Sequence, residues 1–375
     1  MKKIITLVLF FVISGCNKAA TTPPPDYDLL VNDVVTVGEI NAGIVLFNPE
    51  NMRIEYIFNP RMVYGEAYEP GSIIKLLTSI AYFQSHSPFT YTTNGNYFVH
   101  PIDREAIKKG QRIRERRKIS SRTYPVFRGD FFPDGGMCPR GEVNFINAFA
   151  HSSNSYFLEM ITRMDFNVWY QLGKTVGFGE KTGLENPLNA QTGSTHASAP
   201  ADNSPRPAYL VAGDIPESAG EFAFKNTFNK LMCAIGLGPQ LKITALQYAV
   251  FLASVFNGGK IMKPIYRGQT AQVIRRYQIP QNLELIYKAL SETSLSGTGR
   301  GFTITGADAV YSKSGSTMQH KKPYKPNGWF AGVVKAKNRY LGFVCLVESR
   351  TSSTAKHLVA LLLRSYIKNS LTVER

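Results

Sequence analysis

The sequence predicts an α/β fold of the α+β kind, in which a five-stranded antiparallel sheet flanked by helices is joined to a mainly helical lobe. Three observations support this prediction. Strand patterns occur near both ends of the folded region, patterns of helical spacing fill its centre, and a last helical pattern closes the chain. We therefore expect the sheet to be assembled from both ends of the chain, with the helical lobe between its two halves.

Five segments carry strand patterns. Residues 42–47 and 53–58 are apolar, β-branched or aromatic, and the polar turn 48–51 between them predicts a hairpin. Three further segments of this kind follow near the other end of the chain: 309–316, 329–334 and 340–347. We expect all five to pair in one antiparallel sheet.

Helical spacing marks the centre and the end of the chain. The central helices are expected at 73–83, 143–162, 166–176, 244–256 and 282–290. In 356–368 an apolar stripe at helical spacing predicts a closing helix that covers one face of the sheet. Residues 189–207 are rich in Ser, Ala, Pro and Asn, which indicates a surface loop.

The N-terminus has the pattern of an export signal, predicted for residues 1–15. Lys2 and Lys3 precede the apolar stretch 4–13, which is too short for the roughly 20 residues of a spanning helix. Small residues then precede Cys16, an arrangement that resembles the acylation site of bacterial lipoproteins. The alternative is an ordinary secretory peptide with an incidental cysteine. We expect a protein on the periplasmic or cell-surface side of a bacterial membrane, anchored by lipid on Cys16.

A tether is expected before the folded region. Residues 16–33 are polar and include the proline-rich run 21–25, which predicts a stiff linker. Residues 34–375 are more than the usual ~150 residues of one domain, so they predict either one large domain or two closely packed lobes.

The chain is strongly basic, with a net charge of +16. Its densest basic patch lies within 104–122, where no aromatic residue is interleaved. Together with the export signal, this argues against a nucleic-acid partner. A solvated hairpin or helix face is the simplest interpretation, and anionic lipid head groups or cell-wall polymers are the alternatives.

The three remaining cysteines do not predict a disulfide framework or a zinc site. Cys138, Cys233 and Cys345 are odd in number and have no short spacing. Cys233 and Cys345 lie in apolar company and are expected in the core. The sequence predicts no metal ion.

A serine and a lysine three residues apart form the first motif. Ser72 and Lys75 follow Pro70 and Gly71. Positions i and i+3 of a helix share a face, so the Lys75 amine can reach the Ser72 hydroxyl, and a helix N-terminus favours the developing negative charge. The motif therefore predicts a serine nucleophile with an amine as its base.

Two later motifs can complete such a site. Ser152 and Asn154, the second motif, lie in a helical stretch, and a turn is needed before both can face one cleft. Lys313, Ser314 and Gly315, the third motif, offer a cation, a hydroxyl and a close backbone approach, which suit a bound carboxylate. The alternatives are a polar helix junction and a strand edge that pairs with an extended peptide.

Similar fragments elsewhere show how weak each motif is alone. Ser353 and Ser365 are each followed by a lysine three residues later, and 181–183 spells Lys-Thr-Gly. Neither serine has the preceding Pro and Gly, and 181–183 follows a helix-ending turn with no strand before it. Context thus favours the three motifs above.

In their order and context, the three motifs resemble the active site of the penicillin-recognising serine enzymes. The similarity is to the transpeptidase domain of penicillin-binding proteins of the class without a glycosyltransferase, particularly the elongation type. It implies the fold of these enzymes, with 34–375 as the transpeptidase domain. Beyond the motifs it includes the stretches GIVLFNPENMRIEYIFNP, INAFAHSSNSYF, VGFGEKTGLENP, IGLGPQLKITALQYAVFLASVFNGGKIMKP and NGWFAGVV.

The resemblance implies catalytic roles for Ser72, Lys75 and Ser152 and a substrate-binding role for Asn154. Ser72 would attack the carbonyl of a D-alanyl-D-alanine stem peptide or of a β-lactam, and Lys75 would take its proton. Ser152 would relay a proton to the leaving group, and Asn154 would hold the substrate amide. No cofactor is implied.

It also implies a binding role for the third motif and its neighbour. Lys313 and Ser314, next to Gly315, would receive the terminal carboxylate, and the backbone N–H groups of Ser72 and Ser316 would form the oxyanion hole. Family members usually carry threonine where this chain has Ser314. The hydroxyl is retained, but its rotamer is less constrained.

The expected partners follow from the same resemblance: peptidoglycan stem peptides, β-lactams and, through Cys16, a membrane. Family members normally carry a long non-catalytic N-terminal module, where this chain has only the linker, so protein partners are not predicted.

We expect a D,D-transpeptidase that cross-links peptidoglycan and is acylated by penicillin. A D,D-carboxypeptidase, a serine β-lactamase and a non-catalytic domain that only binds β-lactams or peptidoglycan are the alternatives.

Overall fold

The computed structural model describes residues 39–93, 139–184, 217–222, 227–238, 240–318 and 325–372, together with residues 31 and 35 and four short strands between 97 and 133. The predicted five-stranded antiparallel sheet is confirmed, with the order β13-β14-β15-β1-β2. Its strands are β1 (Ala42–Phe47), β2 (Ile54–Phe58), β13 (Ala309–Met318), β14 (Pro326–Ala336) and β15 (Arg339–Val347). Strands from both ends of the chain are thus neighbours, because β1 pairs with β15.

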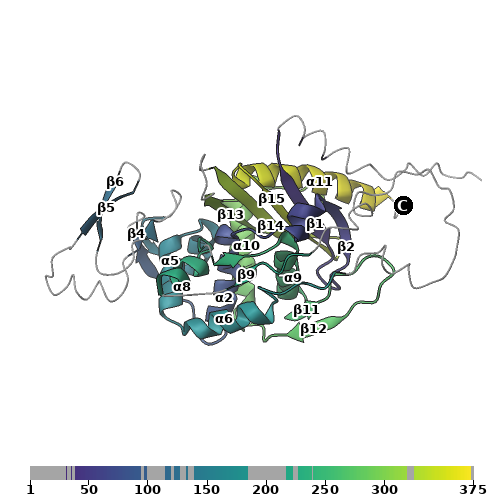
Figure 1. Cartoon of the computed structure of the whole chain (residues 1–375). Helices are drawn as coiled ribbons and strands as arrows, with labels where there is room; N and C mark the ends of the chain where they lie inside the picture. Colours follow the sequence, from purple (N-terminus) through teal and green to yellow (C-terminus); the bar gives the residue numbers. More distant parts are fainter. Residues whose placement is uncertain are drawn as a thin grey trace, which may run out of the picture.

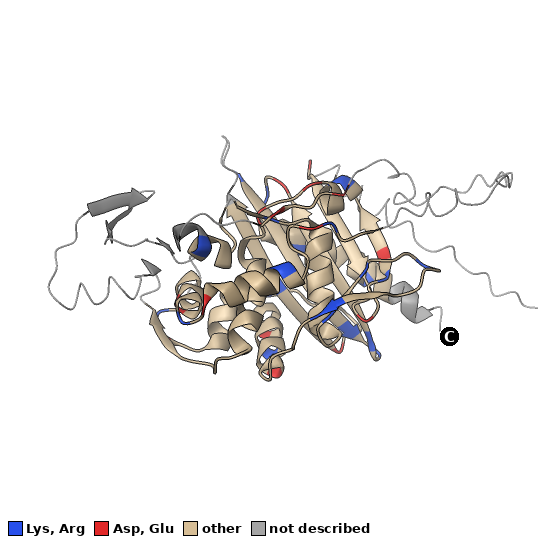
Figure 2. Cartoon of the chain, turned by 60° about the horizontal axis from the view of Figure 1, so that its bottom comes forward, with Lys and Arg blue, Asp and Glu red and all other residues tan. Residues whose placement is uncertain are grey.

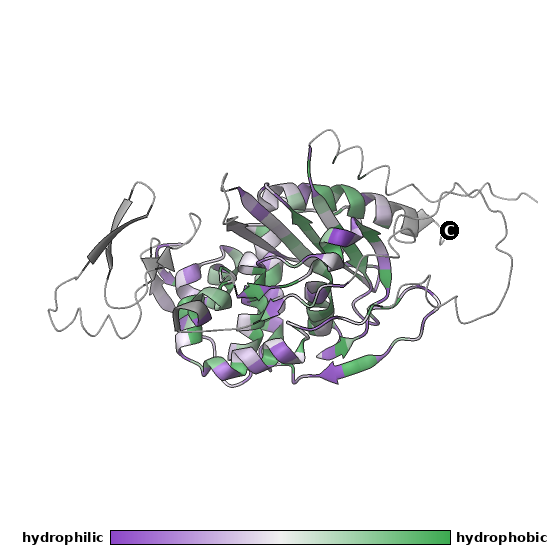
Figure 3. Ribbon diagram, viewed as in Figure 1, coloured by the Kyte–Doolittle hydropathy of each residue, from purple (hydrophilic) through white to green (hydrophobic). Residues whose placement is uncertain are grey.

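Helices cover both faces of this sheet (Figure 1). The closing helix α11 (Ser352–Thr372) packs against β14 and β15 on one face. On the other face, α9 (Ala245–Phe256) packs on β15 and β1, and α10 (Leu283–Leu295) packs on β13. Hydrophobic residues are frequent in the strands and in α9, whereas α10 and α11 mix hydrophobic with hydrophilic residues (Figure 3). The core accordingly has two parts, a small one under α11 and a larger one that continues into the helical lobe.

The helices predicted in the centre of the chain are all present, in the lobe or, as α9 and α10, on the sheet, with one difference. The segment expected as a single helix at 143–162 is two helices separated by a turn, because Asn144 and Ser153 each cap a helix start by accepting a backbone hydrogen bond. The lobe helices are α2 (Lys75–Phe83), α4 (Phe145–Ala150), α5 (Asn154–Thr162), α6 (Phe166–Thr175) and α8 (Thr227–Ala234). The last of these was not predicted.

Several short elements were also not predicted, because they are too short to show a periodic pattern. They are η1 (Arg61–Gly65), η2 (Gly71–Ile74) and the strand pairs β3 (Tyr91–Thr93) with β8 (Gly141–Val143), β4 (Tyr97–Phe98) with β7 (Phe132–Pro133), β5 (Glu115–Ile119) with β6 (Arg122–Val126), β9 (Glu221–Phe222) with β10 (Leu241–Lys242), and β11 (Lys260–Met262) with β12 (Val273–Arg276). The exception among them is the β5–β6 pair, which lies largely in the basic patch where a hairpin was one interpretation.

Some expectations fall on residues outside the described ranges: the signal 1–15, Cys16, Cys138, the loop 189–207 and most of the basic patch. Part of that patch forms the β5–β6 hairpin. Val31, within the expected linker, is buried in the smaller core. Cys233 and Cys345 are buried and free, which confirms their predicted place in the core. None of the described helices combines the length and the hydropathy needed to cross a bilayer.

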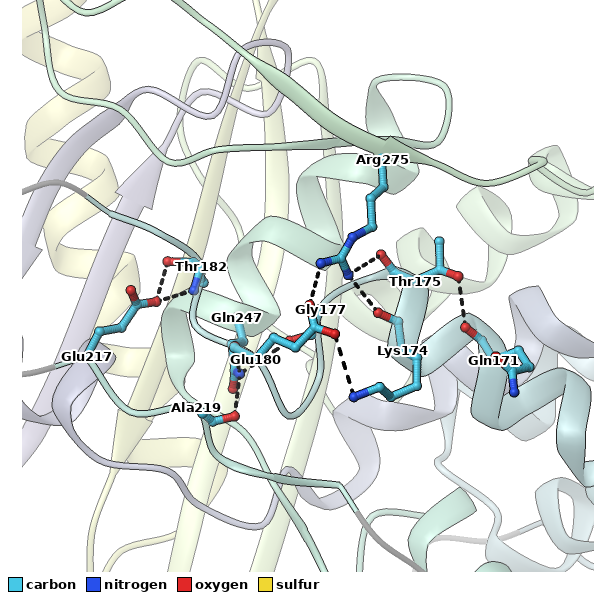
Figure 4. Close-up of polar contacts among 10 residues, drawn as sticks. All are labelled: Gln171, Lys174, Thr175, Gly177, Glu180, Thr182, Glu217, Ala219, Gln247 and Arg275. Carbon is cyan, nitrogen blue, oxygen red and sulfur yellow. Dashed lines mark hydrogen bonds and ion pairs between the residues drawn. The ribbon is translucent and has the colours of Figure 1, made fainter.

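The described basic residues are spread over helices, strands and loops (Figure 2). Polar contacts fix the loop that follows α6 (Figure 4). The Glu180 carboxylate pairs with Arg275 of β12, and Gln247 of α9 donates to the backbone oxygen of Glu180 at 2.6 Å. Thr182 donates through its hydroxyl to Glu217 at 2.5 Å, so the Lys-Thr-Gly sequence at 181–183 belongs to this loop and not to a strand.

The turn that contains Ser72 packs closely between two other backbone segments. Gly71 has φ +58°, and its N–H donates to the Gly236 oxygen at 2.9 Å. A Cβ atom on Gly71 would lie 2.8 Å from the Ser316 nitrogen. Gly236 has φ +85°, and a Cβ atom there would overlap the Gly71 carbonyl. Only glycine at these two positions allows the three segments to approach this closely.

This packing predicts different costs for two glycine substitutions. Gly236→Ala combines a left-handed backbone with a steric overlap, whereas Gly258→Ala, at φ +80°, meets no atom within 4 Å. We expect Gly258→Ala to lower the free energy of unfolding by about 1 to 2 kcal/mol. Gly236→Ala should cost about 1 to 3 kcal/mol more. Urea unfolding of both variants measures the difference. Equal losses of unfolding free energy would contradict the close packing of Gly236 against Gly71.

Candidate active site

Ser72 lies in the short 3₁₀ turn η2, which leads directly into α2 at Lys75. Side chains from two other elements hold this turn. The Trp329 indole of β14 donates to the backbone carbonyl of Glu69 at 2.9 Å. The buried Tyr248 hydroxyl of α9 donates to the backbone carbonyl of Ile73, also at 2.9 Å. Ser72 keeps partial exposure, whereas Lys75 is fully buried. The turn therefore joins a partly exposed serine to a buried lysine.

The second motif lies in the turn between α4 and α5. Ser152 has φ +61°, which is uncommon for a residue with a Cβ atom, and Asn154 begins α5. The break in the helix supplies the turn that the spacing of the two residues required. It also directs the Ser152 carbonyl toward Lys75, which donates to it at 2.7 Å. This charge-assisted bond offsets part of the backbone strain.

Lys75 joins the first motif to the second. Its ammonium donates to the Ser152 carbonyl, to Asn154 Oδ1 at 2.7 Å and to Ser152 Oγ at 3.3 Å. In the described part of the chain no hydrogen bond joins Lys75 Nζ to Ser72 Oγ, although their spacing suggested one. Three acceptors in the turn already match the three donors of an ammonium. Such bonds are often absent until a substrate binds, so the geometry leaves Lys75 available as a base once it loses a proton.

Lys313 joins the third motif to the second. Its ammonium donates to Ser152 Oγ at 2.9 Å and to the Ser314 oxygen at 3.1 Å. The Ser152 hydroxyl therefore lies between two amines, Lys75 and Lys313, both buried. The Lys313 nitrogen also lies 5.5 Å from the centre of the Phe149 ring.

The two buried amines affect each other electrostatically. Burial, and then the nearby Lys75 ammonium, hold the pKa of Lys313 well below its usual value of about 10.4. Lys313 therefore loses its proton more easily than an exposed lysine would.

The side chains of successive residues of β13 point to opposite faces of the strand, so Lys313 and Ser314 contact different parts of the structure. Lys313 reaches Ser152, whereas Ser314 donates to the Thr298 hydroxyl at 2.5 Å. Gly315 lies against the Ser72 turn, where a Cβ atom would be 2.8 Å from the Pro70 oxygen. Ser316 packs with its backbone nitrogen beside Gly71. All three motifs therefore meet around one site.

The fragments that imitate the motifs lie elsewhere. Ser353 is exposed on α11, and Lys356 donates to the Arg300 oxygen at 2.8 Å. The sequence reasoning did not identify Thr298, which contacts Ser314. The available signal was its run Ser-Gly-Thr-Gly directly after α10, a turn rich in small residues in the connection between α10 and β13.

The residues at the site are hydroxyls, amines and an amide, which are poor ligands for a divalent cation at this spacing. Within the described ranges, no three His, Cys, Asp or Glu side chains gather as a metal centre would require.

Comparison with known proteins identifies the family. The model of the penicillin-binding protein transpeptidase domain matches residues 102–365. No curated protein matches the chain. Among solved structures, the apo transpeptidase domain of penicillin-binding protein 3 from Burkholderia pseudomallei is 14% identical with a TM-score of 0.65, and the match covers 93% of each chain.

Two further structures show the same fold. A peptidoglycan glycosyltransferase from Burkholderia ambifaria has a TM-score of 0.67 at 13% identity, over 92% of this chain and 95% of that one. The D,D-transpeptidase domain of a peptidoglycan glycosyltransferase from Eggerthella lenta has a TM-score of 0.60 at 15% identity, over 93% of this chain and 81% of that one. With a family match over more than half of its length and this fold, the chain belongs to the penicillin-binding protein transpeptidase domain family.

Proposed function

We propose that the chain is a serine D,D-transpeptidase that acts on D-Ala-D-Ala stem peptides in peptidoglycan cross-linking and is acylated by penicillin. One observation carries the proposal: the amines of Lys75 and Lys313 lie 3.3 and 2.9 Å from Ser152 Oγ, and Lys75 directly follows the turn that contains Ser72. A nucleophile beside an amine, with a shared hydroxyl and a second cation, suits acyl transfer from a substrate that ends in a carboxylate.

The first half of the reaction forms an acyl-enzyme. Ser72 Oγ attacks the carbonyl of the penultimate D-alanine, and its proton passes to Lys75 in the neutral form. The C–N bond then breaks, and the departing D-alanine amine takes a proton from Ser152. Ser152 is reprotonated by the ammonium of Lys75. The products are an ester at Ser72 and free D-alanine, with the proton count unchanged.

In the second half, an amine of a neighbouring stem peptide attacks the ester. The ester C–O bond breaks, a new amide forms, and the amine proton returns to Ser72 through the same lysine. The packing of Gly71 against Ser316 supports an oxyanion hole made by the N–H groups of Ser72 and Ser316. Lys313 and Ser314 would hold the terminal carboxylate, and Asn154 the substrate amide.

Export and lipid attachment at Cys16 remain part of the proposal. The support is the sequence alone: two lysines, an apolar stretch and a small pair before the cysteine. Such an anchor would hold the catalytic domain on the periplasmic or cell-surface side of a bacterial membrane, next to its peptidoglycan substrate.

Labelling with a fluorescent penicillin tests the nucleophile. The wild-type protein should form a stable covalent adduct, and Ser72→Ala should form none, because the attacking oxygen is gone. Ser353→Ala is the matched control and should label like the wild type, since Ser353 is exposed on α11. An adduct on Ser72→Ala, or rapid hydrolysis of a chromogenic cephalosporin by the wild type, would contradict the proposed transpeptidase.

A second test uses the lowered pKa of Lys313. A bound carboxylate stabilises the Lys313 ammonium. Binding therefore takes up a proton whenever the pH lies above the pKa that Lys313 has in the free protein. The affinity of Ser72→Ala for a penicillin should be constant below that pKa and fall above it, by up to about tenfold per pH unit. Competition titrations between about pH 6 and pH 10 measure this. The methyl ester of the same penicillin should show no such fall, and an equal fall for acid and ester would exclude the proposed contact.

A further inference from the structure

Three polar groups connect the third motif to the end of α4. Ser314 Oγ donates to Thr298 Oγ1 at 2.5 Å, and Thr298 Oγ1 donates to the Ala150 carbonyl at 3.3 Å. The Thr298 backbone N–H donates to the same carbonyl at 2.9 Å. Ala150 is the last residue of α4, two residues before Ser152. Thr298 thus lies between the carboxylate-binding hydroxyl and the turn of the second motif.

The backbone around Thr298 holds it firmly in this place. A Cβ atom on Gly297 would overlap the Ala150 carbonyl, and one on Gly299 would lie 3.0 Å from Ser312 Oγ. The Gly297 N–H caps the end of α10 by donating to the Glu292 oxygen at 3.1 Å. The loop therefore fits closely against both α4 and β13, and the Thr298 hydroxyl has a defined position.

The direction of the hydrogen bonds matters for ligand binding. A hydroxyl has one proton, and in the free protein the proton of Ser314 points to Thr298. A carboxylate offers only acceptors, so Ser314 must turn its proton toward it. Its oxygen then needs a donor. Thr298 can supply one by rotating its own proton to Ser314, at the expense of its long bond to Ala150, whose carbonyl keeps the Thr298 N–H.

We propose that Thr298 is a positioning residue that sets the Ser314 hydroxyl for carboxylate recognition, by reversing the direction of their shared hydrogen bond when a ligand binds. This inference rests on the proposed function. It also accounts for the serine at position 314: the rotamer constraint that the γ-methyl of a threonine would provide comes instead from the Thr298 hydroxyl.

The test compares Thr298→Val with Thr298→Ser. Valine keeps the shape of threonine but can neither donate nor accept a hydrogen bond, whereas serine keeps the hydroxyl. The second-order rate constant of acylation by a penicillin should fall about five- to tenfold in Thr298→Val, the equivalent of one hydrogen bond, and recover in Thr298→Ser. Thr303→Val, at an exposed position after the same loop, is the matched control and should match the wild type.

The methyl ester of the same penicillin separates positioning from structural damage. The ester should acylate Thr298→Val at the wild-type rate, to within about twofold, because the ester lacks the charge that Ser314 recognises. Equal losses with acid and ester would overturn the inference and indicate a structural role. Unchanged acylation by the acid would overturn it as well, while leaving the proposed function intact. A wild-type protein that no penicillin acylates would overturn both.

A second pair of variants tests the rotamer argument. In a Ser314→Thr background the γ-methyl restricts the side chain, so Thr298→Val should cost less than in the wild-type background. We expect the five- to tenfold loss to shrink to about twofold. The same loss in both backgrounds would show that Thr298 does not act on the orientation of the residue at 314.

Discussion

The site depends on the close approach of three backbone segments. The Ser72 turn contacts the 236 turn through Gly71 and Gly236, and it contacts β13 through Gly315 and Ser316. No side chain separates these segments, so the Ser72 turn, the backbone of Ser316 and the third motif are held at a short distance from one another. Trp329 adds a hydrogen bond from the next strand to the same turn. A site that must stabilise a developing charge benefits from such a fixed frame, because its dipoles need not reorganise during the reaction.

Within this frame the electrostatics come from two buried amines. Burying one ammonium is costly, and placing a second beside it raises that cost, which is the physical cause of the lowered pKa of Lys313. The terminal carboxylate of the proposed substrate would relieve both effects at once, because it would pair with the charge and replace lost solvation. The same unfavourable pairing that weakens the free protein therefore favours a ligand with a carboxylate.

The sheet was predictable because its five strands and closing helix have clear periodic patterns, and the motifs were predictable because their order matches a known family. Contacts between side chains were less predictable from the sequence. Helical spacing placed Lys75 beside Ser72, but the ammonium binds the turn at 152–154, whose acceptors arise only from the break in the helix. Thr298 was missed because its contact with Ser314 depends on how the loop after α10 folds back on α4. α8 is only 8 residues long, which is too short for its helical spacing to predict a helix from the sequence.

The hydroxyl groups of the site reconcile a rigid backbone with the movement of protons. Ser152 lies between two amines, and Thr298 lies between Ser314 and a backbone carbonyl. A hydroxyl can exchange its donor and acceptor roles by rotating one hydrogen, with no displacement of heavier atoms. In the proposed mechanism, protons would thus be relayed at Ser152 and redirected at Ser314 without any change in the glycine contacts. A carboxylate or an amide at either position would need to shift its heavy atoms or its charge to do the same, so the preference of this site for small hydroxyls follows from the tight packing around it.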